Sequence, residues 1–471
     1  MWEFNTVMAN IIDVPFVGQS YHLKDWSVDC QRTLNLYPQS VESGNAPQVS
    51  ALLPTPGLIA KYELNGTVRG LYPISIGILA VVGTQLFLLG ETAEQIGEIA
   101  GENIVSFADN RIDVLIIGEP VTYAFKQSSK ELRIIAGGGF LGATDVTFLD
   151  SRFIVLNPES DQIQWSGLLN TEFSALGYAT AEASSDKLVR IFAQNGQLWL
   201  VGERTTEIWH STGSADQPFL RVSGAYINCG CIAKNSLAQF GTSLIWLSQT
   251  DVGDGQVVLT EGYQVKRISN HAMEQEFASY ERLDDAVGYS YQQEGHSFYM
   301  LSFPTANKTW CFDGSTGMWH ERSYYNLNSQ HERHRSQVHC FYKGKHYVGD
   351  HTNGIIYELS LDAETDNGHM IMRERTTPVI NPKGQRLIFD ALEIFIQTGQ
   401  HVNREPIVML DWSDDQGQTW SFDQQETLGK VGEWKKRVIF RRLGQAFNRV
   451  FRLRVTDSSR LIITGAQAKV R

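Results

Sequence analysis

The stretch Asn195–Gly213, NGQLWLVGERTTEIWHSTG, contains the pattern that decides the fold. A turn leads into an apolar strand, a short polar link follows, and a second strand ends in an aromatic residue before a turn of small residues. The same order of features recurs in EGHSFYMLSFPTANKTWCFDGSTGMW from residue 294 and in YKGKHYVGDHTNGIIYELS from residue 342. Alternation with aromatic and β-branched residues is typical of strands, so we expect an all-β protein.

Weaker copies of this pattern begin near Ile78, Arg111, Ser151 and Gly241, which gives about seven copies between residues 57 and 362. Their spacing of roughly 35–45 residues is that of a β-propeller blade. In a propeller, each sheet buries its faces against the neighbouring sheets, and closure of the ring leaves few exposed edges. The sequence therefore predicts a β-propeller of six or seven blades.

Two segments lie outside the repeats. Residues 1–54 have polar turns and few strong strands, and we expect an extended N-terminal arm that lies on the ring or on a neighbouring subunit. Residues 376–471 alternate strongly, as in Phe451, Leu453 and Val455, which is typical of a β-sandwich. We thus expect an arm over 1–54, a propeller over 55–375 and a C-terminal β-sandwich over 376–471.

The chain is acidic, with 52 Asp and Glu against 40 Lys and Arg, a net charge of −12. This sign argues against a protein that wraps nucleic acid by neutralising phosphates, but an acidic channel wall would keep DNA from adhering. No segment approaches the roughly 18 apolar residues of a membrane helix. The five cysteines predict reduced, buried thiols rather than a disulfide framework.

The sharpest short motif is SDDQGQTW over residues 413–420, which matches the Asp box S-x-D-x-G-x-T-W. Asp415 can cap its own turn, Gly417 can supply a positive φ, and Trp420 can pack back on the preceding strand. Ser413 and Thr419 complete the motif. It predicts a structural hairpin turn and no activity.

Arginines make the C-terminal end basic within an acidic chain; they are Arg441, Arg442, Arg449, Arg452 and Arg454. One interpretation is that they occupy outward strand positions on a solvated face. The other is that they form a docking surface for an acidic partner or for DNA in a channel.

Candidate chemical sites are few, and we expect no catalytic residues, no cofactor and no metal. The Asp box also occurs in sialidases, so a propeller glycosidase or glycan-binding module is the alternative function. A sialidase-like site needs several arginines, a tyrosine and carboxylates, and no motif in the sequence brings these residue types together. His331, His334, His339 and Cys340 match no standard zinc spacing and are expected as solvated loop residues. The run Gly137–Gly139 lacks the Lys-Ser/Thr partner of a phosphate loop.

Three segments together resemble a known family. Asn35, Tyr37 and Pro38 are followed by Pro56-Gly57 and then by NGTVRG at 65–70. The stretch LWLVGERTTEIWHSTG at 198–213 and the segment from Arg437 to Arg471 are similar to the same family. This family is the packaged-DNA stabilisation proteins, or tail accessory factors, also called tail hub or nozzle proteins, of short-tailed enterobacterial phages.

The resemblance implies a non-enzymatic structural protein of the virion, assembled in the bacterial host cytoplasm. It implies a homohexameric ring below the portal and the head-to-tail adaptor ring, which extends the DNA channel and helps retain packaged DNA. The implied partners are the needle or plug protein, the tailspike or tail fibre, and double-stranded DNA that passes through without sequence-specific binding. No membrane is implied.

Overall fold

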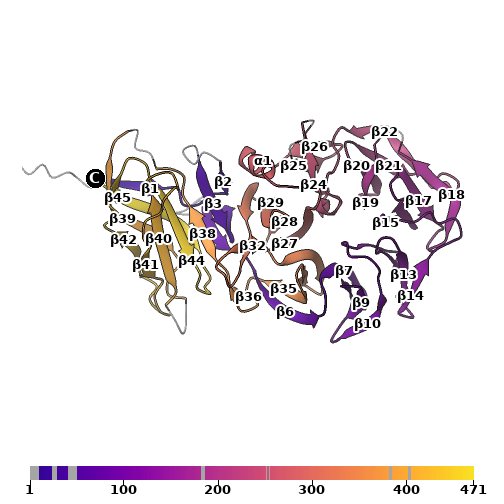
Figure 1. The fold of residues 1–471 in the computed structure, drawn as a ribbon, viewed down its shortest axis with the longest axis horizontal. Coiled ribbons are helices and arrows are strands. Elements are labelled where there is room, and N and C mark those ends of the chain that lie inside the picture. The colour runs from indigo at the N-terminus through magenta and orange to yellow at the C-terminus, as the bar shows by residue number, and fades with distance from the viewer. Residues whose placement is uncertain are drawn as a thin grey trace, which may run out of the picture.

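The computed structural model describes residues 10–23, 29–40, 50–181, 186–250, 252–253, 255–380, 384–400 and 405–471. Strands dominate these residues, which contain one α-helix, α1 (His271–Phe277), and one 3-10 turn, Lys234–Ser236. The prediction of an all-β protein is confirmed. The molecule is elongated, with a ring of sheets at one end and a sandwich at the other (Figure 1). Within the described segments, no helix has the length and hydropathy needed to span a membrane.

The ring contains seven four-stranded antiparallel units among the described residues. The first three are β7 (Val68–Ile74), β8 (Gly77–Val82), β9 (Gln85–Leu89) and β10 (Ala93–Glu98); β11 (Ser106–Asp109), β12 (Asp113–Ile117), β13 (Thr122–Lys126) and β14 (Glu131–Ile135); and β15 (Asp145–Leu149), β16 (Arg152–Leu156), β17 (Gln162–Ser166) and β18 (Phe173–Thr180). The next three are β19 (Leu188–Gln194), β20 (Gln197–Gly202), β21 (Thr206–Ser211) and β22 (Phe219–Ile227); β23 (Ala238–Phe240), β24 (Ser243–Gln249), β25 (Gly255–Glu261) and β26 (Gln264–Arg267); and β27 (Val287–Gln293), β28 (His296–Phe303), β29 (Lys308–Asp313) and β30 (Met318–Glu321). The expected β-propeller is confirmed.

The seventh unit closes the ring with a strand from the other end of the chain. β33 (Ser336–Tyr342), β34 (Lys345–Asp350) and β35 (Gly354–Ser360) are joined by β6 (Gly57–Leu64), which runs antiparallel to β35. The hairpin of β36 (Thr365–Asp366) and β37 (His369–Met370) then covers the outer edge of β6. A small hairpin, β31 (Ser323–Tyr325) with β32 (His331–Arg333), precedes this unit.

Apolar cores lie between neighbouring units around the ring. β8 is buried at all of its positions because both faces of its sheet are covered. One core joins Val201 and Ile208 of the fourth unit to Leu244 and Trp246 of the fifth. Another joins Val68 of the first unit to Ile356 of the seventh, so the ring is sealed by side-chain packing as well as by β6.

The C-terminal part is a β-sandwich, as predicted. Its strands are β38 (Arg373–Thr376), β39 (Leu387–Ile396), β40 (Ile407–Ser413), β41 (Gln424–Thr427), β42 (Val438–Arg441), β43 (Gln445–Ala446), β44 (Val450–Val455) and β45 (Ile463–Val470). One sheet contains β45, β39 and β42, and the other contains β38, β44, β40 and β41. A single core that includes Phe389, Phe440 and Phe451 fills the space between them.

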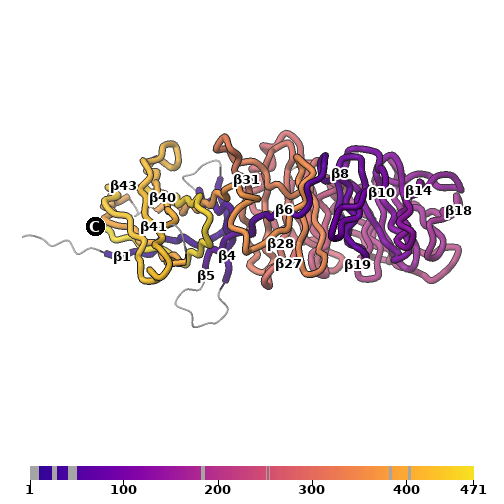
Figure 2. Tube along the Cα trace, turned by 90° about the horizontal axis from the view of Figure 1, so that it is seen from below, coloured from indigo at the N-terminus to yellow at the C-terminus, as the bar shows by residue number. Residues whose placement is uncertain are grey.

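The N-terminal segment, expected as an arm, contributes strands to both parts in its described residues. They are β1 (Asn10–Val14), β2 (Tyr21–His22), β3 (Cys30–Leu34), β4 (Leu36–Ser40) and β5 (Ser50–Pro54). β1 pairs with β45, and β3 lies between β30 of the propeller and β38 of the sandwich. A ten-stranded sheet therefore runs from the propeller into the sandwich, and Figure 2 shows β4 and β5 between the two parts.

All five cysteines are buried free thiols, as the sequence predicted. They are Cys30, Cys229, Cys231, Cys311 and Cys340. Burial raises the pKa of the Cys231 thiol to about 11, and its Sγ donates to the Ala233 carbonyl over 3.0 Å. A thiol with so high a pKa is a poor nucleophile at neutral pH.

Candidate functional site

The Asp box forms a self-contained turn between β40 and β41. The Asp415 carboxylate accepts hydrogen bonds from the Ser413 hydroxyl (2.7 Å), the Thr419 amide (2.8 Å) and the Thr419 hydroxyl (2.6 Å). These bonds hold the pKa of Asp415 at about 2. Gly417 has a φ of +88° and donates its amide to the Ser413 oxygen over 2.7 Å. The side chains of Ser413, Asp415 and Thr419 are thus hydrogen-bonded within the turn itself.

The predicted basic surface is divided between the interior and the exterior of the sandwich. Arg449 is 1% exposed and donates to both oxygens of Asp414 at 2.6 Å, so it lies inside and does not belong to any docking surface. Arg452 and Arg454 are partly buried and share the Asp411 carboxylate. The Arg452 guanidinium also lies 3.8 Å over the Trp420 ring. Only Arg441 and Arg442 of the five are fully on the exterior.

Within the histidine cluster, His334 and Cys340 are buried and His331 and His339 are partly buried, which corrects the expectation of a solvated loop. His334 lies inside and shares a hydrogen bond of 2.6 Å with the Ser336 hydroxyl. His339 of β33 faces His346 of β34, and Cys340 points into the core between the first and seventh units. The charged neighbours of these histidines suggested solvent, but both faces of a propeller sheet are covered. No cluster of three metal-ligating side chains occurs among the described residues.

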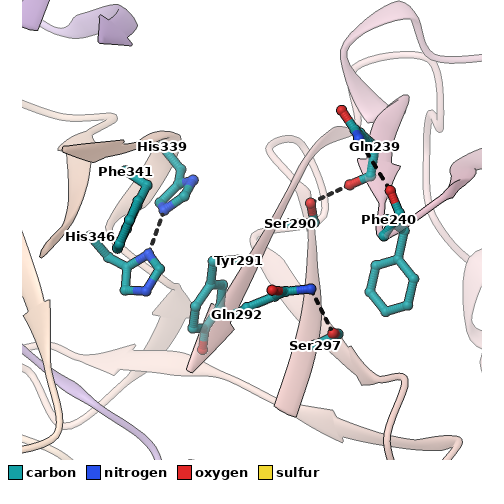
Figure 3. Close-up of a pocket in the computed structure, with 10 residues that line it drawn as sticks. Gln239, Phe240, Ser290, Tyr291, Gln292, Ser297, His339, Phe341 and His346 are labelled. Atoms are coloured by element: carbon teal, nitrogen blue, oxygen red, sulfur yellow. Dashed lines mark hydrogen bonds between the residues drawn. The ribbon is translucent and has the colours of Figure 1, made fainter. Parts of the chain in front are cut away.

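A cavity opens where the fifth, sixth and seventh units meet (Figure 3). It is lined by Gln239, Phe240, Gly241, Ser290, Tyr291, Gln292, Ser297, His339, Phe341 and His346. The imidazole nitrogens of His339 and His346 lie 3.0 Å apart, and burial lowers the pKa of both rings. Its described walls contain aromatic rings, amides and hydroxyls but neither a carboxylate nor an arginine.

Asn35, one of the residues that carry the family resemblance, connects the propeller to the sandwich. Its amide nitrogen donates to the Ser323 carbonyl (3.1 Å) and to the Met372 carbonyl (2.8 Å), and its side-chain oxygen accepts from the Ser323 amide (2.9 Å). Its φ of +52° is in the left-handed region, which Asn tolerates better than most residues. The side chain is buried, so these bonds join three segments in the absence of solvent.

Arg69, from the motif NGTVRG, links the first two units of the ring. Its buried guanidinium donates to the carbonyls of Gly83 (2.9 Å), Ile99 (3.3 Å), Ala100 (3.1 Å) and Asn103 (2.8 Å). These carbonyls lie in the β8–β9 turn and in the segment that follows β10. The arginine of this motif therefore has a structural role. Gly57, from the Pro56-Gly57 pair, has one as well, because a Cβ at this position would lie 2.4 Å from the Thr365 carbonyl oxygen.

Two family models match the chain in sequence order. The model described as "Bacteriophage P22 Gp10, beta-propeller" matches residues 18–364, and "Bacteriophage P22 Gp10, beta-sandwich" matches residues 372–471. The chain belongs to the bacteriophage P22 Gp10 family. It is a structural protein of a phage tail, and the resemblance noted from its sequence is confirmed.

This Gp10-family chain also matches solved structures at low TM-scores and low sequence identity. One is the computationally designed Ika8 protein (7% identity, TM-score 0.40, 64% of this chain and 99% of that chain). A second is YCF48 bound to D1 peptide (11% identity, TM-score 0.40, 65% of this chain and 98% of that chain). A third is the N-terminal domain of Nup159 (9% identity, TM-score 0.39, 70% of this chain and 98% of that chain). No curated protein matches the chain.

Sequence reasoning missed which polar residues of this Gp10-family chain form its internal connections. Asn35 and Arg69 were noted for the resemblance, but their acceptors are backbone carbonyls that leave no trace in the sequence. Arg449 did carry a signal. It precedes β44 by one residue, and strand alternation places it on the inward side with Phe451 and Leu453.

Proposed function

We propose that this protein is the tail hub, or nozzle, of a short-tailed phage. Six copies form a ring below the portal and the head-to-tail adaptor ring, extend the DNA channel, help retain the packaged genome, and support the needle or plug and the tailspikes or fibres. The observation that carries this proposal is the match of both Gp10 family models, in order, over residues 18–364 and 372–471.

The physical properties of the chain support this role. A net charge of −12 repels a passing duplex, so DNA can slide through a channel of such subunits without adhering. The sheet shared by propeller and sandwich makes each subunit a stiff unit, because the two parts are hydrogen-bonded through β3. The buried free thiols suit assembly in a reducing cytoplasm.

The protein acts in this proposal without catalysis. A glycosidase requires two carboxylates beside its substrate, and a sialidase requires arginines to hold a carboxylate as well. The cavity at the fifth, sixth and seventh units offers none of these in its described walls. A glycan-binding propeller is the alternative, and its test is binding to a broad glycan array.

Quantitative mass spectrometry of purified phage particles tests the proposal. We expect this chain at half the number of portal subunits, as six copies against twelve. Particles that lack it should fill with DNA and then lose it. Absence of the chain from purified particles would contradict the tail role, and particles that keep their DNA without it would contradict the retention role alone.

A further inference from the structure

The charge of the chain is divided sharply between its two parts. Residues 1–371 contain 23 Lys and Arg against 41 Asp and Glu, a net charge of −18. Residues 372–471 contain 17 against 11, a net charge of +6. Residues 1–56, which contribute strands to both parts, account for −3 of the −18, so a basic sandwich is attached to a propeller with a net charge of −15. These three charges sum to the −12 of the whole chain.

Much of the sandwich's positive charge is neutralised internally. Arg449 pairs with Asp414, and Arg452 and Arg454 pair with Asp411. The segment between β41 and β42 differs, because its sequence Trp434-Lys435-Lys436-Arg437 presents three consecutive basic side chains. Lys435 has no ion pair among the described residues and is exposed, and Arg437 is exposed although it pairs with Glu393.

Large apolar side chains are exposed beside these charges. Trp434 is 61% exposed and Val431 is 49% exposed. Shallow grooves flank Lys436 on two sides, one formed with Gly432 and Trp434 and the other with Ile396 and Arg437. We call Val431, Trp434, Lys435, Lys436 and Arg437 the Trp434 patch. Tryptophan and arginine are the residues that most often anchor protein interfaces.

Backbone hydrogen bonds hold the segment of the patch in place. The Glu433 amide donates to the Lys430 carbonyl over 3.0 Å, and the Lys436 amide donates to the Glu433 carbonyl over 3.1 Å. The Glu433 carboxylate also accepts from the Lys430 amide over 3.0 Å. A surface fixed before binding loses little conformational entropy when a partner covers it.

We propose that the Trp434 patch binds the acidic propeller of a neighbouring copy of this chain. The inference rests on the proposed ring. A closed ring requires a heterologous contact, in which two different surfaces of the same chain meet. Each copy carries both halves, a basic patch on the sandwich and an acidic propeller, so the same contact repeats around the ring.

The position of the patch favours another copy over its own propeller. β42, which follows the patch, lies at the end of the molecule away from the propeller (Figure 1). A nucleic acid fits the patch less well, because phosphates would meet Glu433 and the apolar Trp434 and Val431 alongside the basic residues. Protein interfaces, in contrast, combine aromatic anchors with a charged rim.

Cross-linking of assembled particles tests the contact directly. A carbodiimide joins lysine amines to carboxylates that touch them, and particles assembled from a mixture of ¹⁵N-labelled and unlabelled copies distinguish links between copies from links within one. We expect Lys435 or Lys436 linked to carboxylates of residues 57–371 in another copy. The proposal is overturned if these lysines are linked only to a different virion protein, only to the same copy, or to no carboxylate. It is also overturned if the lysines become available for cross-linking only after the DNA has been removed.

Variants supply the second measurement. Lys435→Glu with Lys436→Glu should lower the number of copies per portal by about tenfold at physiological salt, since it reverses the charge of the contact. Trp434→Ala should have an effect of similar size through loss of the apolar anchor. The matched control is Lys266→Glu with Arg267→Glu on β26, which makes the same charge change on exposed propeller residues and should assemble normally.

The outcomes separate this inference from the proposed function. If the wild-type chain is present in particles at six copies and the patch variants incorporate normally, the contact is wrong and the tail role stands. If the chain is absent from particles, both are wrong. Thermal unfolding of each variant checks that a loss of incorporation does not arise from unfolding of the sandwich.

Discussion

Replacement of Arg449 tests whether this arginine stabilises the interior of the sandwich or serves as part of a docking surface. Arg449 is 1% exposed, whereas its partner Asp414 is 41% exposed. Its guanidinium donates to both Asp414 oxygens and to the Leu443 carbonyl, and it lies 4.6 Å from the centre of the Phe389 ring and 5.2 Å from that of Trp412.

The expected loss of stability follows from these contacts. Breaking a fully buried ion pair costs about 3–5 kcal/mol, but Asp414 can be rehydrated in the variant, which removes part of this cost. The Leu443 carbonyl is left without its donor, at about 1–3 kcal/mol, and the ring contacts are lost as well. We therefore expect Arg449→Ala to lower the free energy of unfolding of the sandwich by about 3 kcal/mol. Arg449→Met, which keeps most of the packing, should lower it by about 2 kcal/mol.

Urea denaturation followed by tryptophan fluorescence measures this loss, because Trp412 contacts Arg449 directly. The control is Arg441→Ala on the exposed end of β42, which should change stability by less than about 0.5 kcal/mol. The internal role is refuted if the free energy of unfolding of Arg449→Ala lies within about 1 kcal/mol of the wild-type value and the variant still fails to assemble. Arg449 would then belong to a docking surface.

Three further predictions follow from contacts already described. Arg69→Ala should destabilise the propeller by about 4 kcal/mol, because four carbonyls at buried or partly buried hydrogen bonds lose a charged donor, and calorimetry should show Arg69→Lys at roughly half that loss. Burial, with Arg322 and His351 nearby, lowers the pKa of His334 to about 3. The unfolded chain takes up this proton below about pH 6.5 and the folded chain does not, so stability should fall by about 2 kcal/mol for this residue as the pH drops from 8 to 5. His334→Gln should remove that part of the pH dependence in urea titrations, and a variant that keeps the wild-type slope between pH 8 and pH 5 would contradict the prediction. Asp415→Ala should accelerate hydrogen exchange of the Thr419 amide without an effect on particle assembly; a loss of assembly would show that the Asp box does more than form a turn.

The regular parts of the fold could be predicted from the sequence because they depend on local alternation. The stretch Asn195–Gly213 contains β20 and β21, and the alternation of Phe451, Leu453 and Val455 marks a sandwich strand. The closing strand β6 could not be placed in this way. Gly57–Leu64 is a strand by its pattern, but its partner β35 is about three hundred residues away, and nothing local specifies that pairing.

The polar sites were harder to predict because charge in the sequence does not indicate exposure. His334 has charged neighbours on both sides in the chain but is buried in the structure. Arg449 and Arg441 are both arginines in a basic segment, yet one is inside the sandwich and the other is on its exterior. Strand alternation distinguishes the inward Arg449 from Arg452, whereas the acceptors of Asn35 and Arg69 emerge only when distant segments meet.

The pairing of β1 with β45 fixes the order in which the chain can fold during its synthesis. β1 begins at Asn10 and its partner ends at Val470, so β1 has no partner until the ribosome has translated the residues up to β45. At bacterial rates of about 5–20 residues per second this wait is roughly half a minute to a minute and a half. The propeller also stays open until β35 emerges, since β6 closes it. The nascent protein thus carries unpaired strand edges for most of its translation, and overproduction is expected to favour aggregation at this stage rather than after completion.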